Sequence, residues 1–256
     1  MILFLSVWML CVVGSEPNES PREPIQFQCK FDKPTWYALW GIKTNPKNTR
    51  VILHDDRTCL EITVKDDGHY GTSFKYLFSQ QVGFEPEELY ASFDINYLDI
   101  DGYWGKTPGF DGTYHRGGWG GRTSDGINGW SARSSLDARA GECRQSFYVY
   151  HAQQKGTYGD GWPWQNAGET LLSHGRWYRI KQYIKLNTPG KADGVLRAWV
   201  NGRLAFDKTD IMFRKVNALR IFSYWVDFYF GGKPKAPREF KILLDNVKIS
   251  TVPLDS

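Results

Sequence analysis

Hydrophobic and polar residues alternate along most of the chain, in short runs separated by turn residues. The longest run covers 89–100 (LYASFDINYLDI), where a period of two predicts a half-buried β-strand. The sequence predicts further strands at 50–55, 59–66, 146–152, 177–186, 194–207, 217–230 and 239–250. Asn201-Gly202 separates two apolar runs and is the strongest hairpin signal in the chain.

This number of strands, with little sign of helix, predicts an all-β fold, either a sandwich of two antiparallel sheets or a jelly roll. The glycine-rich stretch 102–129 interrupts the strand pattern. Because it carries aromatic and cationic residues, we expect an ordered loop that folds over a concave sheet. The 256 residues suffice for one large β domain, which we place at 25–256.

The N-terminus predicts export from the cell. Residues 1–15 (MILFLSVWMLCVVGS) are apolar and uncharged and end in small residues, as in a secretory signal peptide cleaved after Ser15. About 14 apolar residues are too few to span a bilayer. A charged lead at 16–24 should be flexible. We therefore expect a secreted, extracellular protein that is monomeric and does not bind a membrane.

Cleavage of the signal leaves three cysteines, Cys29, Cys59 and Cys143. In an oxidising compartment this odd number predicts one disulfide and one free thiol. We expect a Cys29–Cys59 disulfide because both residues lie in the N-terminal part. Cys143 should then be a free cysteine in a polar loop.

Composition narrows the possible partners only slightly. The net charge of +4 permits a polyanionic partner without requiring one, and 16% of the residues are aromatic. The five histidines lack the spacing of metal ligands, and no phosphate-binding or dinucleotide motif is present. We expect no metal, no cofactor and no nucleic acid partner.

Two functions other than the one favoured below remain open. Asp99 and Asp101 form the best carboxylate pair for a glycoside hydrolase, which needs two carboxyl groups flanking one bond. However, both precede Gly102 at a predicted strand end, where aspartate commonly serves a turn. The other alternative is a carbohydrate-binding jelly roll without catalysis.

Two tyrosines favour a different chemistry, β-elimination from a uronic acid. Tyr148 and Tyr150 share one strand face, and Phe147 and Val149 supply a core face on the other side. The reaction needs a cation for the carboxylate, a base for the C5 proton and an acid for the leaving oxygen. Tyrosine can act as base or acid where nearby cations lower its pKa.

The cations for this chemistry lie close by in the sequence. Lys106 lies in a turn held by glycine and proline, and Arg133 shares a strand face with Ser131. If the strand at 129–137 pairs antiparallel with 146–152, Arg133 meets the tyrosines.

At these residues the chain resembles polysaccharide lyase family 14, the alginate and glucuronan lyases of marine molluscs and chlorella viruses. The family's Gly-Gly-Lys-Leu-Pro-Gly turn resembles 104–109 (WGKTPG), its Ser-x-Arg strand resembles 131–133, and its Tyr-x-Tyr strand resembles 148–150. The resemblance runs from about 91 to 249. Trp104 and Thr107 depart from it, since the family has glycine and leucine at these places.

The resemblance implies a jelly roll with an open cleft and an enzyme that cleaves an acidic polysaccharide. Its implied active-site residues are Lys106, Ser131, Arg133, Tyr148 and Tyr150. We expect one of the tyrosines to transfer the proton, the lysine and the arginine to neutralise the carboxylate, and the serine to position the substrate.

The long glycine-rich loop adds three candidates for substrate binding. Arg116 and Arg122 suit bidentate contacts with uronate carboxylates. Trp119 suits stacking with a sugar ring, since the ring carries an apolar face.

Overall fold

The computed structural model describes residues 23–254, and strands dominate it. One sheet, called the back sheet, has eight strands: β1 (Gln26–Cys29), β2 (Thr49–His54), β3 (Arg57–Val64), β5 (Glu88–Tyr97), β11 (Trp177–Lys185), β12 (Gly194–Val200), β13 (Arg203–Ile211) and β15 (Phe240–Ser250). The front sheet has seven: β4 (Tyr70–Leu77), β6 (Trp104–Gly112), β7 (Trp130–Arg139), β8 (Glu142–Tyr150), β9 (Asp160–Pro163), β10 (Leu172–Ser173) and β14 (Ser223–Phe230). The described helices are short: η1 (Trp36–Trp40), α1 (Phe78–Gln81) and η2 (Gly168–Thr170).

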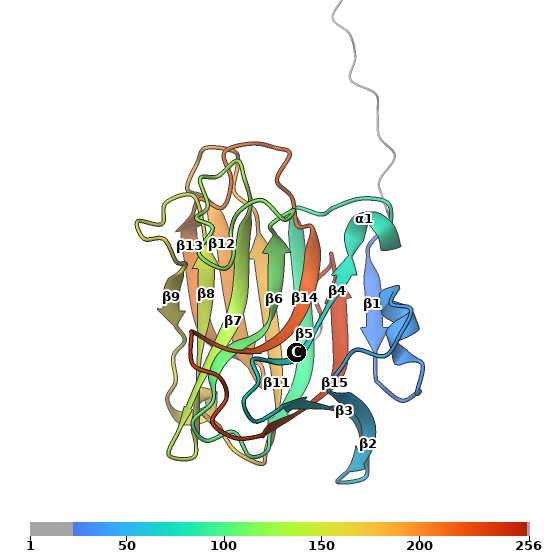
Figure 1. Cartoon of the computed structure of the whole chain (residues 1–256). Coiled ribbons are helices and arrows are strands. Elements are labelled where there is room, and N and C mark those ends of the chain that lie inside the picture. The colour runs from blue at the N-terminus through green and yellow to red at the C-terminus, as the bar shows by residue number, and fades with distance from the viewer. Residues whose placement is uncertain (1–22, 255–256) are drawn as a thin grey trace, which may run out of the picture.

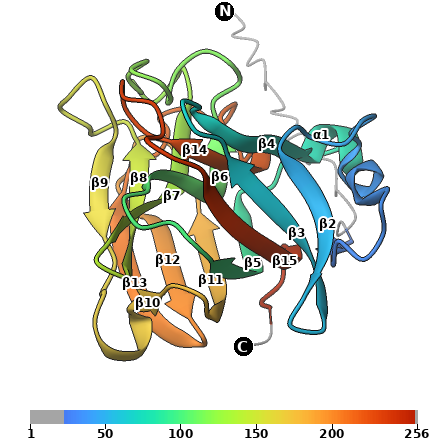
Figure 2. The same cartoon turned by 60° about the horizontal axis from the view of Figure 1, so that its bottom comes forward.

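Both sheets are antiparallel, which confirms the predicted jelly-roll sandwich. The back sheet has the order β13–β12–β11–β5–β15–β3–β2, and β1 pairs with β15. The front sheet has the order β10–β8–β7–β6–β14–β4, and β9 pairs with β8 (Figure 1). Figure 2 shows the sheets as two layers. We call the surface of the front sheet that points away from the back sheet the front face.

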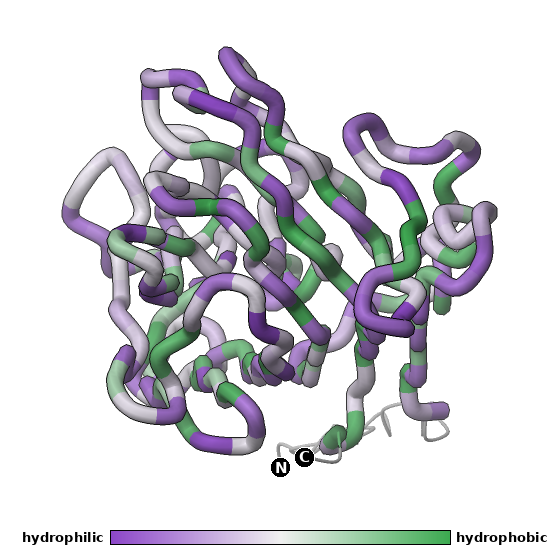
Figure 3. The backbone as a smooth tube through the Cα atoms, turned by 90° about the horizontal axis from the view of Figure 1, so that it is seen from below, coloured by the Kyte–Doolittle hydropathy of each residue, from purple (hydrophilic) through white to green (hydrophobic). Residues whose placement is uncertain are grey.

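Alternation along the strands builds the core between the layers. In β8, Phe147 and Val149 are fully buried against the back sheet, as predicted, and Tyr148 points to the front face. The loops around the rim are mostly hydrophilic (Figure 3). The predicted hairpin at Asn201-Gly202 is confirmed: both residues have positive φ, 47° and 80°, as a two-residue turn between β12 and β13 requires.

The sequence-based prediction for 102–129 was wrong in its first half. Residues 104–112 form β6, which lies in the front sheet between β7 and β14. The strand tolerates proline because it contains a bulge: the register with β7 shifts between Lys106 and Gly109. The loop proper is 113–129.

The bulge decides which side chains of β6 reach the front face. Lys106 is paired with Ser135 and Gly109 with Arg133, so three steps along β6 match two along β7. Both residues therefore point to the same side, which regular alternation would forbid.

A polar contact from the back sheet supports the bulge. Gln182 of β11 is fully buried, and its amide donates to the carbonyl of Pro108 (3.1 Å) and to the hydroxyl of Ser134 (2.5 Å). The hydroxyl of Tyr224 donates back to Gln182 (3.2 Å). Since a buried carbonyl without a partner is costly, these bonds stabilise the irregular segment.

The predicted disulfide is absent: Cys29, Cys59 and Cys143 are all buried free thiols. Cys29 packs into the core that contains Leu60. Cys59 is the neighbour of Leu60 in β3, so alternation turns it to the opposite side of the sheet, where burial and Asp245 raise the pKa of its thiol to about 11. Cys143 lies in β8 and not in a polar loop.

Several predictions concern residues at or beyond the ends of the described segment. The signal peptide at 1–15 and most of the lead at 16–24 lie outside it. Within 23–254, none of the helices has the length and apolar character needed to cross a membrane.

Gly109 offers a test of this packing. A Cβ atom there would lie 2.5 Å from the Ala132 carbonyl oxygen and 2.5 Å from the Arg133 Cα atom. Both are backbone atoms, so Gly109→Ala should lower the free energy of unfolding by about 1–3 kcal/mol in urea denaturation. Gly161→Ala is the control, because a Cβ atom there meets open space. Equal stability of the two variants would contradict the described packing.

Candidate functional site

One row of paired residues crosses the front sheet and contains two of the predicted site residues, Arg133 and Tyr148. From β4 to β8 it contains Lys75, Trp225, Gly109, Arg133 and Tyr148, each directly opposite the next. The predicted pairing of the Arg133 strand with the tyrosine strand is thereby confirmed. Gly109 leaves a gap in the row, over which the side chains of Arg133 and Trp225 meet.

The adjacent rows add the other predicted residues. Ser131 is opposite Tyr150 on one side, and Lys106 is opposite Ser135 on the other. The structure thus brings together all five residues that the family resemblance implied.

Arg133 forms an ion pair with Asp227, a residue that sequence analysis missed. Its guanidinium lies 4.4 Å from the ring centroid of Trp225, and Nη1 donates to Asp227 Oδ2 at 2.7 Å. Both charged side chains are buried. The sequence did contain a signal for Asp227. In β14, residues of the core alternate with residues of the front face: Tyr224, Val226 and Phe228 belong to the core, and Trp225, Asp227 and Tyr229 to the front face.

The Lys106 amine packs on the ring of Tyr148. Its Nζ atom lies 3.4 Å from the ring centroid. Burial and then the charge of Arg133 lower the pKa of Lys106 to about 7, against the opposing effect of Asp227. The lysine is therefore able to gain or lose a proton near neutral pH.

The two tyrosines differ in how far their side chains are exposed. Their rings are 5.6 Å apart. Burial and a hydrogen bond with Tyr150 raise the pKa of Tyr148, outweighing the effect of Arg133. We had expected nearby cations to lower the pKa, and for Tyr148 this expectation was wrong because desolvation dominates. Tyr150 is 1% exposed, whereas Tyr148 is half-buried.

The 113–129 loop covers Tyr150. The backbone N–H of Gly121 donates to the Tyr150 hydroxyl at 2.9 Å. Ser131 is fully buried, and its hydroxyl donates to the carbonyl of Gly118 at 2.6 Å. In this structure Ser131 therefore anchors the loop.

The loop also carries the three additional candidates. Arg122 lies with its guanidinium 4.6 Å from the ring centroid of Trp119 and donates to the His115 carbonyl at 3.3 Å. These two residues flank Gly121 and so lie near Tyr150. Arg116 is exposed, and within residues 23–254 its side chain forms no ion pair with the row.

A second ion pair, also missed, ends the row. Lys75 Nζ lies 2.5 Å from Asp111 Oδ2 and 4.1 Å from the ring centroid of Trp225. Ser223 donates to the same carboxylate at 2.8 Å. Trp225 is therefore stacked between two cations, Lys75 and Arg133.

The alternative pair of carboxylates lies elsewhere. Asp99 and Asp101 are exposed in the connection between β5 and β6, and Asp99 is paired with Arg238 at 2.8 Å. They lie beside the turn at Gly102 that the sequence allowed, outside the row of paired residues. Among the residues that the structure describes, no group of three His, Cys, Asp or Glu side chains is arranged to hold a metal.

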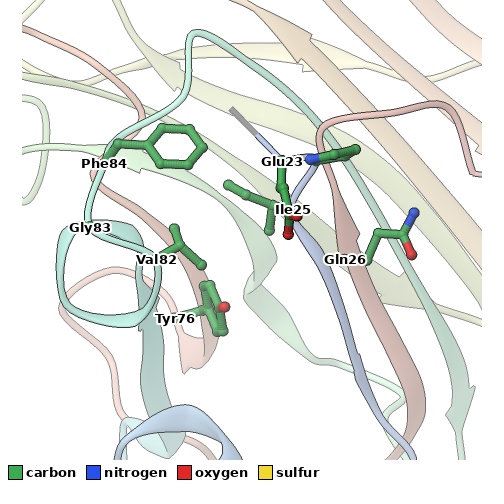
Figure 4. A pocket seen from close by; sticks show the side chains of 8 residues that line it. Glu23, Ile25, Gln26, Tyr76, Val82, Gly83 and Phe84 are labelled. Atoms are coloured by element: carbon green, nitrogen blue, oxygen red, sulfur yellow. The ribbon is translucent and has the colours of Figure 1, made fainter. Parts of the chain in front are cut away.

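One pocket lies away from the row. It measures about 680 Å³ and opens between the start of β1 and the end of β4, where Ile25 and Gln26 face Tyr76, Val82 and Phe84 (Figure 4). None of the eight predicted site residues lines it. The predicted concave cleft stays a prediction.

Comparisons with known proteins identify the family that the sequence motifs resemble. A model of the family Polysaccharide lyase 14 matches residues 62–238, which is more than half of the chain. A search of curated proteins gave no match. Solved structures share the fold.

Three of these structures are enzymes of related description. Alginate lyase Aly36B has 20% identity and a TM-score of 0.72, covering 93% of this chain and 100% of that one. The PL-14 alginate lyase from Aplysia kurodai has 16% identity and a TM-score of 0.70, covering 87% and 97%. The endo-β-1,4-glucuronan lyase from the fungus Trichoderma reesei has 14% identity and a TM-score of 0.54, covering 82% and 89%.

Asp227 generates a prediction about stability. Asp227→Asn leaves the buried Arg133 charge without its counter-ion, so the free energy of unfolding should fall by about 3–5 kcal/mol. Asp137→Asn is the matched control, because its pair with Arg139 (2.9 Å) is exposed and should contribute about 0–1 kcal/mol. Urea denaturation of both variants measures the difference. Similar losses would show that the Asp227–Arg133 pair has no special role.

Proposed function

Because this chain belongs to the polysaccharide lyase 14 family, we propose that it is an exported enzyme that cleaves a uronic-acid polymer of the alginate or glucuronan type by β-elimination. The observation that carries the proposal is the meeting of Lys106, Arg133 and Tyr148 on one face of the front sheet. The apolar N-terminal stretch supports export.

Arg133 stabilises the negative charge of the intermediate. Removal of the C5 proton places charge on the uronate carboxylate, in an enolate-like form. The guanidinium lies on the floor of the site, fixed by Asp227 and Trp225. Its Nε–H is buried and has no partner among the described residues, so the guanidinium acts on the substrate through its positive charge. A preorganised charge of this kind supplies a large part of catalysis.

Lys106 is the base that takes the C5 proton. A general base works best when its pKa lies near the working pH, and the pKa of Lys106 is about 7. This assignment replaces the sequence-based expectation that Lys106 only neutralises the carboxylate. As the neutral amine accepts the proton, the electron pair of the C5–H bond moves to the carboxylate.

Tyr148 is the acid. Its raised pKa keeps the phenol protonated at neutral pH. It gives its proton to O4 as the C4–O4 bond breaks and the C4–C5 double bond forms. Exchange with solvent then removes the proton from the Lys106 ammonium and returns one to the Tyr148 phenolate, which restores both groups. The 113–129 loop covers Tyr150, so Tyr150 affects the reaction through its contact with Tyr148.

Ultraviolet absorbance tests the reaction. The product carries a C4–C5 double bond conjugated to the carboxylate, which the substrate lacks. The mature protein, mixed in turn with polymannuronate, polyguluronate and glucuronan, should raise the absorbance with at least one polymer. Tyr148→Phe should lower the rate at least about 100-fold. New reducing ends without a rise in absorbance would mean hydrolysis and refute the proposal.

The pH dependence tests the role of Lys106. If Lys106 is the base, kcat/KM should fall about tenfold for each pH unit below about 7, because the protonated amine accepts no proton. A lysine that acts as a cation predicts the reverse, a fall as the pH rises above 7. Lys106→Arg separates the roles further: arginine stays charged and should abolish the activity of a base but preserve that of a cation.

A further inference from the structure

An exposed tryptophan lies beside the proposed catalytic residues. Trp104 precedes Lys106 by two positions in β6, so its side chain points to the same front face, about 7 Å further along the strand. It is 50% exposed. Large aromatic side chains exposed on a sheet often mark a binding surface.

The indole ring of Trp104 packs against two glycines of the segment that follows β14. Its ring lies against Gly231 and Gly232, where added Cβ atoms would come within 3.3 and 2.9 Å of it. The N–H of Gly231 also donates to the Trp104 carbonyl at 2.7 Å. The two glycines therefore leave room for the ring and fix its position, which reduces the entropy lost when a ligand binds.

Further aromatic rings continue this surface. Tyr229 lies opposite Lys106 in the neighbouring strand, and its hydroxyl is 3.5 Å from the carbonyl of Gly232. Its ring stacks with His69 (5.6 Å, 16°) and contacts Tyr70 (5.0 Å), which is 62% exposed. We call Trp104, Tyr229, Tyr70 and His69 the aromatic patch.

We propose that the aromatic patch is a subsite that binds a sugar ring of the polymer next to the bond being cleaved. The inference rests on the proposed function. The patch adjoins Lys106 without a break, and the polymer must continue past the cleaved bond. The apolar C–H face of a sugar suits aromatic rings. The exposed Lys233, tied by no ion pair to any residue of the described segment, supplies a cation for that sugar's carboxylate.

This subsite follows from a departure within the family motif. Trp104 replaces the first glycine of the family's Gly-Gly-Lys turn, so a side chain occurs here where that motif has none.

The test compares Trp104→Ala with Trp199→Ala. Trp199 is a partly exposed tryptophan on the outer side of the back sheet, where it contacts Lys181. On the polymer that the wild type cleaves, Trp104→Ala should raise KM about three- to tenfold with kcat within twofold. Trp104→Phe should recover much of the loss, and Trp199→Ala should behave like the wild type. Equal KM values for the two alanine variants would overturn the inference.

A binding measurement separates this inference from the reaction itself. In the Tyr148→Phe background, the affinity for polymannuronate, polyguluronate and glucuronan is measured by the change in tryptophan fluorescence. Trp104→Ala should weaken binding about three- to tenfold, even if none of the polymers is cleaved by the parent enzyme. Unchanged affinity for every polymer that binds would refute the subsite, whatever the outcome of the absorbance assay.

Discussion

The chemistry of the front face depends on one bulge in β6. Without the extra residue between Lys106 and Gly109, one of the two would point into the core. Proline suits the bulge because it has no N–H for the ladder, and Gln182 of the back sheet satisfies its carbonyl. A buried amide in one sheet therefore supports the bulge that sets the direction of the Lys106 side chain in the other. The two layers are linked by more than apolar packing.

Charge on the front face is arranged in pairs. Arg133 is balanced by Asp227 and Lys75 by Asp111, and Trp225 lies between the two cations. Lys106 forms no such pair with any residue in 23–254, and burial next to Arg133 destabilises its ammonium. Its ammonium therefore loses its proton more readily than that of an ordinary lysine. The pairs hold fixed charges in place, whereas the Lys106 amine can change its charge near neutral pH.

Much of the fold and part of the site could be predicted from the sequence. Period-two patterns located most strands, and the facing of Arg133 and Tyr148 followed from antiparallel pairing. β6 was missed because its glycines and Pro108 read as a loop, and only the neighbouring strands make it a strand. Asp227 and Trp104 were missed because their roles depend on partners more than 90 positions away along the chain. The predicted direction of the Tyr148 pKa shift was wrong, because the spacing of residues along the sequence does not show how deeply a side chain is buried.

The row also has a consequence for how the enzyme acquires activity. Lys75, Gly109, Arg133, Tyr148 and Trp225 come from five strands spread over most of the chain. Pairings between such distant segments form slowly, because the chain loses the entropy of loop closure before the new contacts stabilise the pairing. No fragment ending before β14 contains both Arg133 and its counter-ion Asp227. During synthesis, activity should therefore appear only after β14 has docked, as a late and cooperative step.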